Sequence, residues 1–331
     1  MELHSEPRSV SPPRWPLLIN TTQLMTDDDA HRFIHSPTFA SLPLLTALYD
    51  AYPRAILRTD ILRYLLLYFY GGFYADIDTI PKRSVASCPA LSLLFPAVAP
   101  LAATDPLFPR EPPIANVSLV LGLEIDEPAA APATKAYWAW SRTASFAQYT
   151  MYAPRRFSPL LRRVLARALA YSRYQNGVGG VQAAAGAVYT KLDVLEATGP
   201  GMLTDTVLDV LGETLSDRAM VVQASESAAR VEAVGAQLAG TPVPQAERVT
   251  WAPFHGLKSP LAIDAMDLSG EAVAADNEHG GLLVLPINVW GNGQGHSGAD
   301  LDWDGDESCV NHRFQGGWKH SFVDRLYGIW S

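Results

Sequence analysis

The sequence is short of cysteines, of charged residues and of any basic excess. Only two of its 331 residues are cysteines, Cys88 and Cys309, which excludes a disulfide framework and any zinc site built from several cysteines. One bridge between the two remains open, because sequence alone does not give their separation in space. The chain has 25 Lys and Arg against 34 Asp and Glu, a net charge of −9, which argues against a dedicated nucleic-acid-binding protein.

Long apolar runs are also missing. Residues 1–16 are polar and rich in proline, without the apolar core of a signal peptide. Residues 84–104 carry no charge, but Pro89, Pro96 and Pro100 interrupt them. We therefore expect a buried, loop-rich segment there instead of a spanning helix, which needs about 20 predominantly apolar residues. The chain as given reads as soluble.

The remaining composition is that of a globular protein. Hydrophobic residues make up 48% of the chain and charged residues 18%, which is too apolar for disorder and enough for a sizeable core. Helical and strand-like segments alternate, which predicts an α/β layered fold. Helices are predicted at 27–33, 42–52, 59–70, 159–171 and 202–215, strands at 117–125 and 282–289, and a short strand leading into a loop at 73–80.

Two aspartates in the 73–80 segment form the leading candidate site. In a strand, alternate side chains share a face, so Asp76 and Asp78 would point to one side and Ile77 into the core. Paired carboxylates suit Mn²⁺ or Mg²⁺, and such an ion can bridge a nucleotide diphosphate. The same triplet recurs within 300–306, so the context decides: a helix, two glycines, an aromatic strand, and then the aspartates where α/β folds place ligands.

Asp60 and Arg63 lie three residues apart on the helix just before that strand. This spacing puts both side chains on one helix face, where an ion pair exposed to solvent is the simplest interpretation. The neighbouring aspartates favour a functional one. In it, Asp60 accepts hydrogen bonds from sugar hydroxyls, and Arg63 orients Asp60 or reaches a phosphate.

Further candidate residues lie near the C-terminus. A neutral imidazole from His312 would complete a site with two aspartates and would favour Mn²⁺ over Mg²⁺. Gly316 and Gly317 would let the backbone approach a phosphate closely, and Trp318 can donate its indole N–H. Residues 300–306 imitate half of an EF-hand calcium loop, but no glutamate follows at the twelfth position, so we do not expect calcium there.

Several segments together resemble glycosyltransferase family 32. The stretch similar to the family's Asp-x-Asp sugar-binding signature is RTDILRYLLLYFYGGFYADIDT. Other similar stretches are QLMTDDDAHRFI before it, and QYTMYAPRRFSPLL, ATGPGML, LLVLPINVWGNGQGHSGA and NHRFQGGWK after it. The family includes the fungal α-1,6-mannosyltransferase that initiates outer chains and the subunits that mannosylate inositol phosphorylceramide.

The resemblance implies a GT-A-like fold with a single mixed central sheet flanked by helices. We expect one catalytic domain over residues 1–331, with a variable insertion rich in Ala, Gly and Pro at about 216–281. The implied metal ligands are Asp76, Asp78 and His312. The implied donor-binding residues are Asp60, Arg63, Asp76, Thr198, Gly199, Gly317 and Trp318, and the implied catalytic residues are Asp60, Arg63 and Asp78.

The resemblance also implies an activity. We expect a metal-dependent, retaining transferase that moves mannose from GDP-mannose to a lipid or glycan hydroxyl, with UDP-galactose and UDP-glucose left open as donors. The expected cofactor is Mn²⁺, with Mg²⁺ as the alternative. Nucleic acid is not an expected partner. The expected location is a Golgi or secretory-pathway membrane, with a membrane-anchored partner subunit as one option.

Two other interpretations compete with this one. A catalytically inert binding or regulatory subunit on a transferase fold would bind nucleotide in a metal-dependent way without turnover. A haloacid-dehalogenase-type phosphatase also carries Asp-x-Asp after a strand, but it needs threonine four residues after the first aspartate. Here Thr79 lies three residues after Asp76 and Ile80 occupies the fourth place, so the phosphatase pattern fails by one residue.

Overall fold

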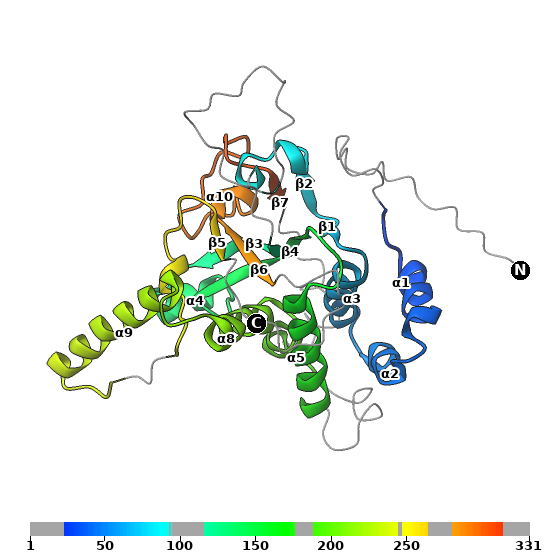
Figure 1. Cartoon of the computed structure of the whole chain (residues 1–331), viewed down its shortest axis with the longest axis horizontal. Helices are drawn as coiled ribbons and strands as arrows, with labels where there is room; N and C mark the ends of the chain where they lie inside the picture. Colours follow the sequence, from blue (N-terminus) through cyan, green and yellow to red (C-terminus); the bar gives the residue numbers. More distant parts are fainter. Residues whose placement is uncertain are drawn as a thin grey trace, which may run out of the picture.

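A mixed five-stranded sheet lies at the centre of the computed structural model (Figure 1). The structure describes residues 23–92, 94, 116–175, 188–243, 247–263 and 280–313. The strand order is β1-β4-β3-β6-β5, with β3 and β6 parallel and the other neighbours antiparallel. The strands are β1 (Gly72–Ala75), β3 (Val117–Asp126), β4 (Ala144–Ala153), β5 (Leu261–Ile263) and β6 (Gly281–Leu285). The predicted α/β class with one mixed central sheet flanked by helices is confirmed.

The central strands are buried on both faces. In β3, Leu119 and Leu121 belong to the large core cluster, and Val120 belongs to a smaller cluster on the opposite side. Burial on both faces explains why these strands read as continuous apolar runs. The strand predicted at 282–289 ends at Leu285, because Pro286 cannot continue the hydrogen-bond ladder and instead precedes a helical turn.

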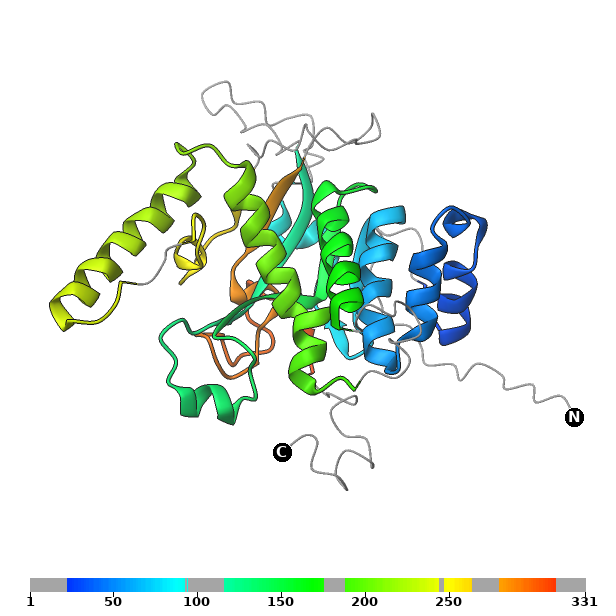
Figure 2. The ribbon, with the colours of Figure 1, turned by 90° about the horizontal axis from the view of Figure 1, so that it is seen from below.

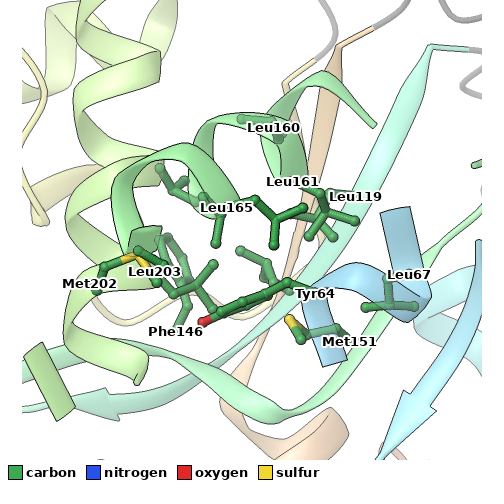
Figure 3. Packing of buried hydrophobic residues seen from close by; sticks show 14 of the residues in the cluster. Tyr64, Leu67, Leu119, Phe146, Met151, Leu160, Leu161, Leu165, Met202 and Leu203 are labelled. Carbon is green, nitrogen blue, oxygen red and sulfur yellow. The ribbon is translucent and has the colours of Figure 1, made fainter. Parts of the chain in front are cut away.

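Three helices cover one face of the sheet (Figure 2). They are α3 (Ala55–Tyr70), α5 (Pro159–Gln175) and α8 (Pro200–Thr214), and α5 packs against both of the others. Figure 3 shows the core between this layer and the sheet, with Tyr64 among side chains that include Leu161 and Leu203. The predicted start of α3 at residue 59 was wrong by four residues, because the good helix formers that follow Pro53 already belong to the helix.

Residues at the ends of the two N-terminal helices determine where these helices begin and end. Thr26 caps α1 (Asp27–Ile34), accepting a hydrogen bond from the backbone N–H of Asp29, whose carboxylate bonds back to the backbone N–H of Thr26. Helix α2 (Pro43–Ala51) ends just before Pro53. Both helices were predicted from these residues, and both are confirmed.

The stretch at 216–281 contributes both a projecting helix and part of the core. Helix α9 (Met220–Ala239) extends away from the sheet (Figure 2), and its Leu238 is 85% exposed. Trp251 and Phe254, however, are buried in the large core cluster, and β5 forms an edge of the central sheet. The change in composition therefore does not coincide with the edge of the core. That residues 1–331 form a single domain stays a prediction.

The shorter elements complete the described part of the chain. They are η1 (Pro37–Phe39), η2 (Val85–Ser87), η3 (Pro89–Leu91), α4 (Pro132–Tyr137), α7 (Lys191–Ala197), η4 (Ala252–Phe254) and α10 (Ile287–Trp290). The turns η2 and η3 agree with the start of the loop-rich segment expected at 84–104, and residues 93 and 95–104 of that segment lie outside the described residues. Among the described residues, no helix combines the length and the apolar character needed to cross a membrane.

A small two-stranded sheet joins distant parts of the chain. Strand β2 (Thr79–Pro81) pairs antiparallel with β7 (Val310–His312). Beside this sheet, Cys88 and Cys309 form a disulfide, so the bridge that the sequence left open is present in the structure. The bridge precedes β7 directly and holds that strand near β2.

Removing this disulfide is expected to destabilise the fold and to loosen β7. Replacing Cys88 and Cys309 together with alanine should lower the free energy of unfolding by about 2–4 kcal/mol, since the bridge closes a long loop of the unfolded chain. Denaturant unfolding of the oxidised protein and of the double variant measures the difference. Equal unfolding midpoints would contradict the prediction.

Candidate active site

Asp76 and Asp78 lie in a tight turn between β1 and β2. The backbone N–H of Thr79 donates to the carbonyl oxygen of Asp76 at 3.0 Å, and the Thr79 hydroxyl donates to the same oxygen at 2.7 Å. Ile77 is 78% exposed. The expectation that Ile77 points into the core was therefore wrong. Strand β1 ends at Ala75, so strand alternation does not govern these side chains and a turn presents both aspartates instead.

The structure brings His312 to the two aspartates. Residue 312 pairs with residue 79 in the β2–β7 ladder, and its Nε2 lies 3.1 Å from Asp78 Oδ1. One ligand atom from each of Asp76, Asp78 and His312 lies within 4.8 Å of the others. The imidazole stacks on the ring of Tyr149, with centroids 4.1 Å apart. All three predicted metal ligands therefore meet at one point.

Asp60 and Arg63 form a buried ion pair, not an exposed one. Arg63 Nη2 lies 2.8 Å from Asp60 Oδ1, and both side chains are 3% exposed. The other terminal nitrogen, Nη1, lies 3.4 Å from Asp76 Oδ1 and donates to the carbonyl oxygen of Gln148 at 3.1 Å. The guanidinium therefore links the predicted sugar-binding carboxylate to a predicted metal ligand.

The loop before α8 completes the surroundings of Asp60. The Thr198 hydroxyl donates to Asp60 Oδ2 at 2.8 Å. The carbonyl oxygen of Thr198 accepts hydrogen bonds from the Tyr64 hydroxyl and from Gln148 Nε2. Gly199 follows as the N-cap of α8, where a Cβ would lie 2.7 Å from a backbone atom of helix α7. Thr198 thus contacts Asp60 directly, but neither Thr198 nor Gly199 is among the residues that line the cavity described below, and their expected role in donor binding stays a prediction.

The buried position of Asp60 and Arg63 shifts the pKa values of both side chains. Desolvation raises the pKa of Asp60 to about 6, although Arg63 and the Thr198 hydrogen bond act in the opposite direction. Burial by itself would lower the pKa of Arg63, but Asp76, Tyr74 and Asp60 outweigh it, and the pKa of the guanidinium is raised. Arg63 therefore stays charged, and the charge on Asp60 depends on pH just below neutrality.

Acidification is expected to remove activity before it unfolds the protein. Below pH of about 6, protonation of Asp60 removes its charge and weakens its pairing with Arg63. Because the folded-state pKa lies above the ordinary value of 3.8, the contribution of Asp60 to stability falls as pH rises from about 4 to 6. Activity and unfolding midpoint should therefore move in opposite directions over this range. Parallel loss of both, from rates and thermal scans, would contradict the assignment.

Two residues that the sequence did not single out, Tyr74 and Gln148, hold the side chains of this site in place. The Tyr74 hydroxyl donates to Asp76 Oδ1 at 2.7 Å, and its ring lies 5.2 Å from the Arg63 guanidinium carbon. Burial raises the pKa of Tyr74 well above its usual value, so its hydroxyl remains a donor. Gln148 joins Arg63 to the Thr198 loop. Tyr74 lies two residues before Asp76 and Gln148 begins a family-like segment, but neither residue type signals this role.

One cavity of about 1370 Å³ is lined by both groups of residues, the Asp60–Arg63 pair and the candidate metal ligands. Its lining also includes Glu124, Trp138, Trp140 and His296, to which the sequence assigned no role. The predicted donor-binding residues Gly317 and Trp318, together with Gly316, lie outside the described residues.

Comparison with known proteins finds a family that matches part of the chain. Residues 13–94 match the model of a family described as "Glycosyltransferase sugar-binding region containing DXD motif". This segment contains Asp60, Arg63 and the Asp76/Asp78 turn. This part of the chain matches the sugar-binding region of a glycosyltransferase family, as its motifs predicted, and the chain is distantly homologous to fungal α-1,6-mannosyltransferases and inositol phosphoceramide mannosyltransferases.

The individual relatives are distant or matched over short segments. The chain is 24% identical over 283 residues to "Initiation-specific alpha-1,6-mannosyltransferase" of Candida albicans, covering 85% of this chain but 58% of that protein. It is 42% identical over 62 residues to "Inositol phosphoceramide mannosyltransferase 3" of Schizosaccharomyces pombe, 19% of this chain and 16% of that protein. Among solved structures, "PaToxG Glycosyltransferase" matches with 19% identity and a TM-score of 0.31, over 64% of this chain and 56% of that one.

Proposed function

We propose that this protein is a metal-dependent, retaining glycosyltransferase that moves mannose from GDP-mannose to a hydroxyl group of a lipid or glycan acceptor. The observation that carries the proposal is the single cavity lined by both the metal-ligand group and the buried Asp60–Arg63 pair. The match to the sugar-binding family supports sugar transfer, and the names of the relatives support mannose and, in two cases, a lipid acceptor. Retention, the GT-A-like fold and a Golgi or secretory-pathway location rest on the resemblance.

The donor atoms at the turn fit a divalent cation. Two carboxylates and one imidazole, from Asp76, Asp78 and His312, form a mixed oxygen and nitrogen set that suits Mn²⁺ better than Mg²⁺. By holding a cation there, the three residues would supply positive charge to offset the negative charge of the departing nucleoside diphosphate. This is the chemistry that the three residues would make available.

Neighbouring residues keep these ligands in position. Arg63 and Tyr74 both contact Asp76, one through charge and the other through a hydrogen bond. The backbone N–H of Arg313 donates to the carbonyl oxygen of Asp78 at 2.9 Å. Such contacts orient ligands before a cation arrives and usually tune metal affinity strongly.

Asp60 is assigned to the hydroxyl groups of the donor sugar. One of its oxygens contacts Arg63 and the other accepts from Thr198, but a carboxylate offers about four lone-pair positions. Since Arg63 also reaches Asp76, the sugar and the diphosphate would be held by one connected group. Holding both reactants in fixed geometry lowers the barrier to transfer.

The proposal is tested by sugar release from GDP-mannose, UDP-galactose and UDP-glucose with Mn²⁺, Mg²⁺ or EDTA. We expect turnover of GDP-mannose with Mn²⁺, loss of turnover with EDTA, and recovery when Mn²⁺ is restored. Metal-dependent nucleotide binding without turnover of any donor, with or without acceptors, would instead support an inert binding subunit. Absence of metal-dependent nucleotide binding would overturn the proposal.

A further inference from the structure

An aromatic cluster lies in the wall of the same cavity. The rings of Trp138 and Trp140 are nearly parallel, with an interplanar angle of 9° and centroids 5.9 Å apart. The ring of His296 meets both edge-on, at 4.9 and 4.8 Å. All three residues line the cavity, and Trp138 is 37% exposed. A large aromatic surface is thus open to a ligand.

The backbone around this cluster is held in an unusual conformation. Among the described residues, three that are not glycine have positive φ, and two of them adjoin the cluster: Ala139 at 52° and Ser297 at 58°. The Ser297 hydroxyl accepts from the backbone N–H of Asp126, and its own N–H donates to Glu127 Oε1. Side chains and backbone therefore stabilise a conformation that non-glycine residues avoid, as is common at ligand sites.

The same wall has polar groups suited to a ligand rich in hydroxyls. Ser145 is 2% exposed and Gln294 is 7% exposed, and both line the cavity. Ser145 Oγ and Gln294 Oε1 have no hydrogen-bond partner within the described part of the chain. Gln294 Nε2 donates to the carbonyl oxygen of Glu124, whose side chain also belongs to the cavity lining. Buried polar atoms normally have partners, so a bound ligand is a natural source of them.

The order of the strands separates Glu124 from the turn that carries Asp76 and Asp78. Asp76 follows β1, Tyr149 lies on β4 and Glu124 on β3, which are successive neighbours in the sheet. The ring of Tyr149 stacks on His312, and the charge of Glu124 contributes to its raised pKa, although burial is the larger cause. Glu124 thus lies two strands beyond the turn that carries Asp76, and Gln294, whose Nε2 donates to the carbonyl oxygens of Glu124 and of His296, joins it to the aromatic cluster.

We propose that Trp138, Trp140 and His296 form the acceptor subsite and bind a six-membered polyol ring, either a pyranose or an inositol. The C–H bonds on the face of such a ring pack against aromatic rings, while its hydroxyl groups need polar partners around the edge. Glu124, Ser145 and Gln294 supply those partners. Burial lowers the pKa of His296 to about 4, so the cluster is uncharged near neutral pH, as packing against C–H groups requires. This inference rests on the proposed function and names its acceptor class.

The test measures binding of two probes to the full chain in the presence of Mn²⁺ and GDP. Titration calorimetry with methyl α-D-mannopyranoside and with myo-inositol shows which ring binds, and so separates a glycan from an inositol-lipid source. Trp138→Ala and Trp140→Ala should each weaken binding of the preferred probe by about tenfold or more. Trp138→Phe should retain most of the affinity. The matched control is Tyr70→Ala, because Tyr70 is 68% exposed, is not part of the cavity lining, and packs against Phe33 instead of the cluster.

The affinity for GDP is measured in every variant. It should stay within about twofold of wild type if the cluster serves the acceptor alone. Weaker GDP binding in the tryptophan variants would show that the cluster holds the nucleotide base and would overturn the proposal. Failure of both probes to bind, or binding unchanged in both tryptophan variants, would also overturn it. If the wild type binds no GDP in the presence of Mn²⁺, the proposed function itself fails, which is a separate result.

Discussion

Asp78→Asn is expected to lower sugar transfer by about a hundredfold or more while leaving the fold intact. The substitution keeps the size of the side chain but removes one of two negative charges from the metal-ligand group. A bound cation stabilises the transition state by several kcal/mol, and a loss of about 3 kcal/mol corresponds to roughly a hundredfold in rate. Transfer rates over a Mn²⁺ titration, together with Mn²⁺ affinity by calorimetry, measure the effect.

The matched control for this variant is Asp306→Asn. Asp306 belongs to another Asp-x-Asp triplet, is exposed, and is not among the residues that line the cavity. Its replacement should leave both rate and Mn²⁺ affinity unchanged. If Asp78→Asn retained full activity with the same dependence on Mn²⁺, residue 78 would not be a metal ligand. Unfolding midpoints of both variants exclude a simple loss of structure.

Arg63→Met is expected to impair both stability and transfer. The guanidinium contacts Asp60, Asp76 and the carbonyl oxygen of Gln148 at once, and methionine supplies neither the charge nor the N–H donors. Because Asp60 is 2% exposed, losing its partner would leave a buried charge without compensation. Breaking a buried pair in this way costs about 3–5 kcal/mol of unfolding free energy. Denaturant unfolding and transfer rates measure the two effects.

A double variant separates the two effects of Arg63. Asp60→Leu combined with Arg63→Met removes both charges together, and an apolar pair of similar volume is often as stable as a buried ion pair. We expect its stability to recover toward wild type while transfer stays absent. Recovery of transfer along with stability would show that the pair is only structural. Arg167→Met serves as the control, because the ion pair of Arg167 with Asp209 is exposed and should contribute about 0–1 kcal/mol.

The sequence was most informative where neighbouring residues decide the structure. The cap of α1 by Thr26 and the end of α3 before Gly71 follow from contacts within a few residues. Continuous apolar runs predicted β3 because a strand buried on both faces needs no polar side. Asp76 and Asp78 of the turn were also identified from the sequence, as were Asp60 and Arg63 of α3, because the spacing of these charged residues is typical of a ligand-binding site.

The predictions from sequence were wrong where a short segment is compatible with two local structures, a strand or a turn. The residues around Asp76 have strand-like composition, yet the chain turns at that point. Strand β2, which follows the turn, pairs with β7 in a separate two-stranded sheet and not with a strand of the central sheet. That pairing joins residues 79 and 312, and no local pattern indicates it. The exposure of Ile77 follows from the turn.

Residue types and local spacing, then, determined the class of fold and the identity of the candidate ligands, and the sequence motifs carried the resemblance to the glycosyltransferase family. Only the tertiary structure decided that His312 reaches Asp78, that Arg63 is buried against Asp76, and that a pair of tryptophans lies in the wall of the same cavity. The physical reason is that helix caps, turns and strand patterns depend on interactions between near neighbours. The site, in contrast, depends on strand order and on contacts between segments far apart in the chain, including the two residues 234 positions apart that meet at the metal-ligand group.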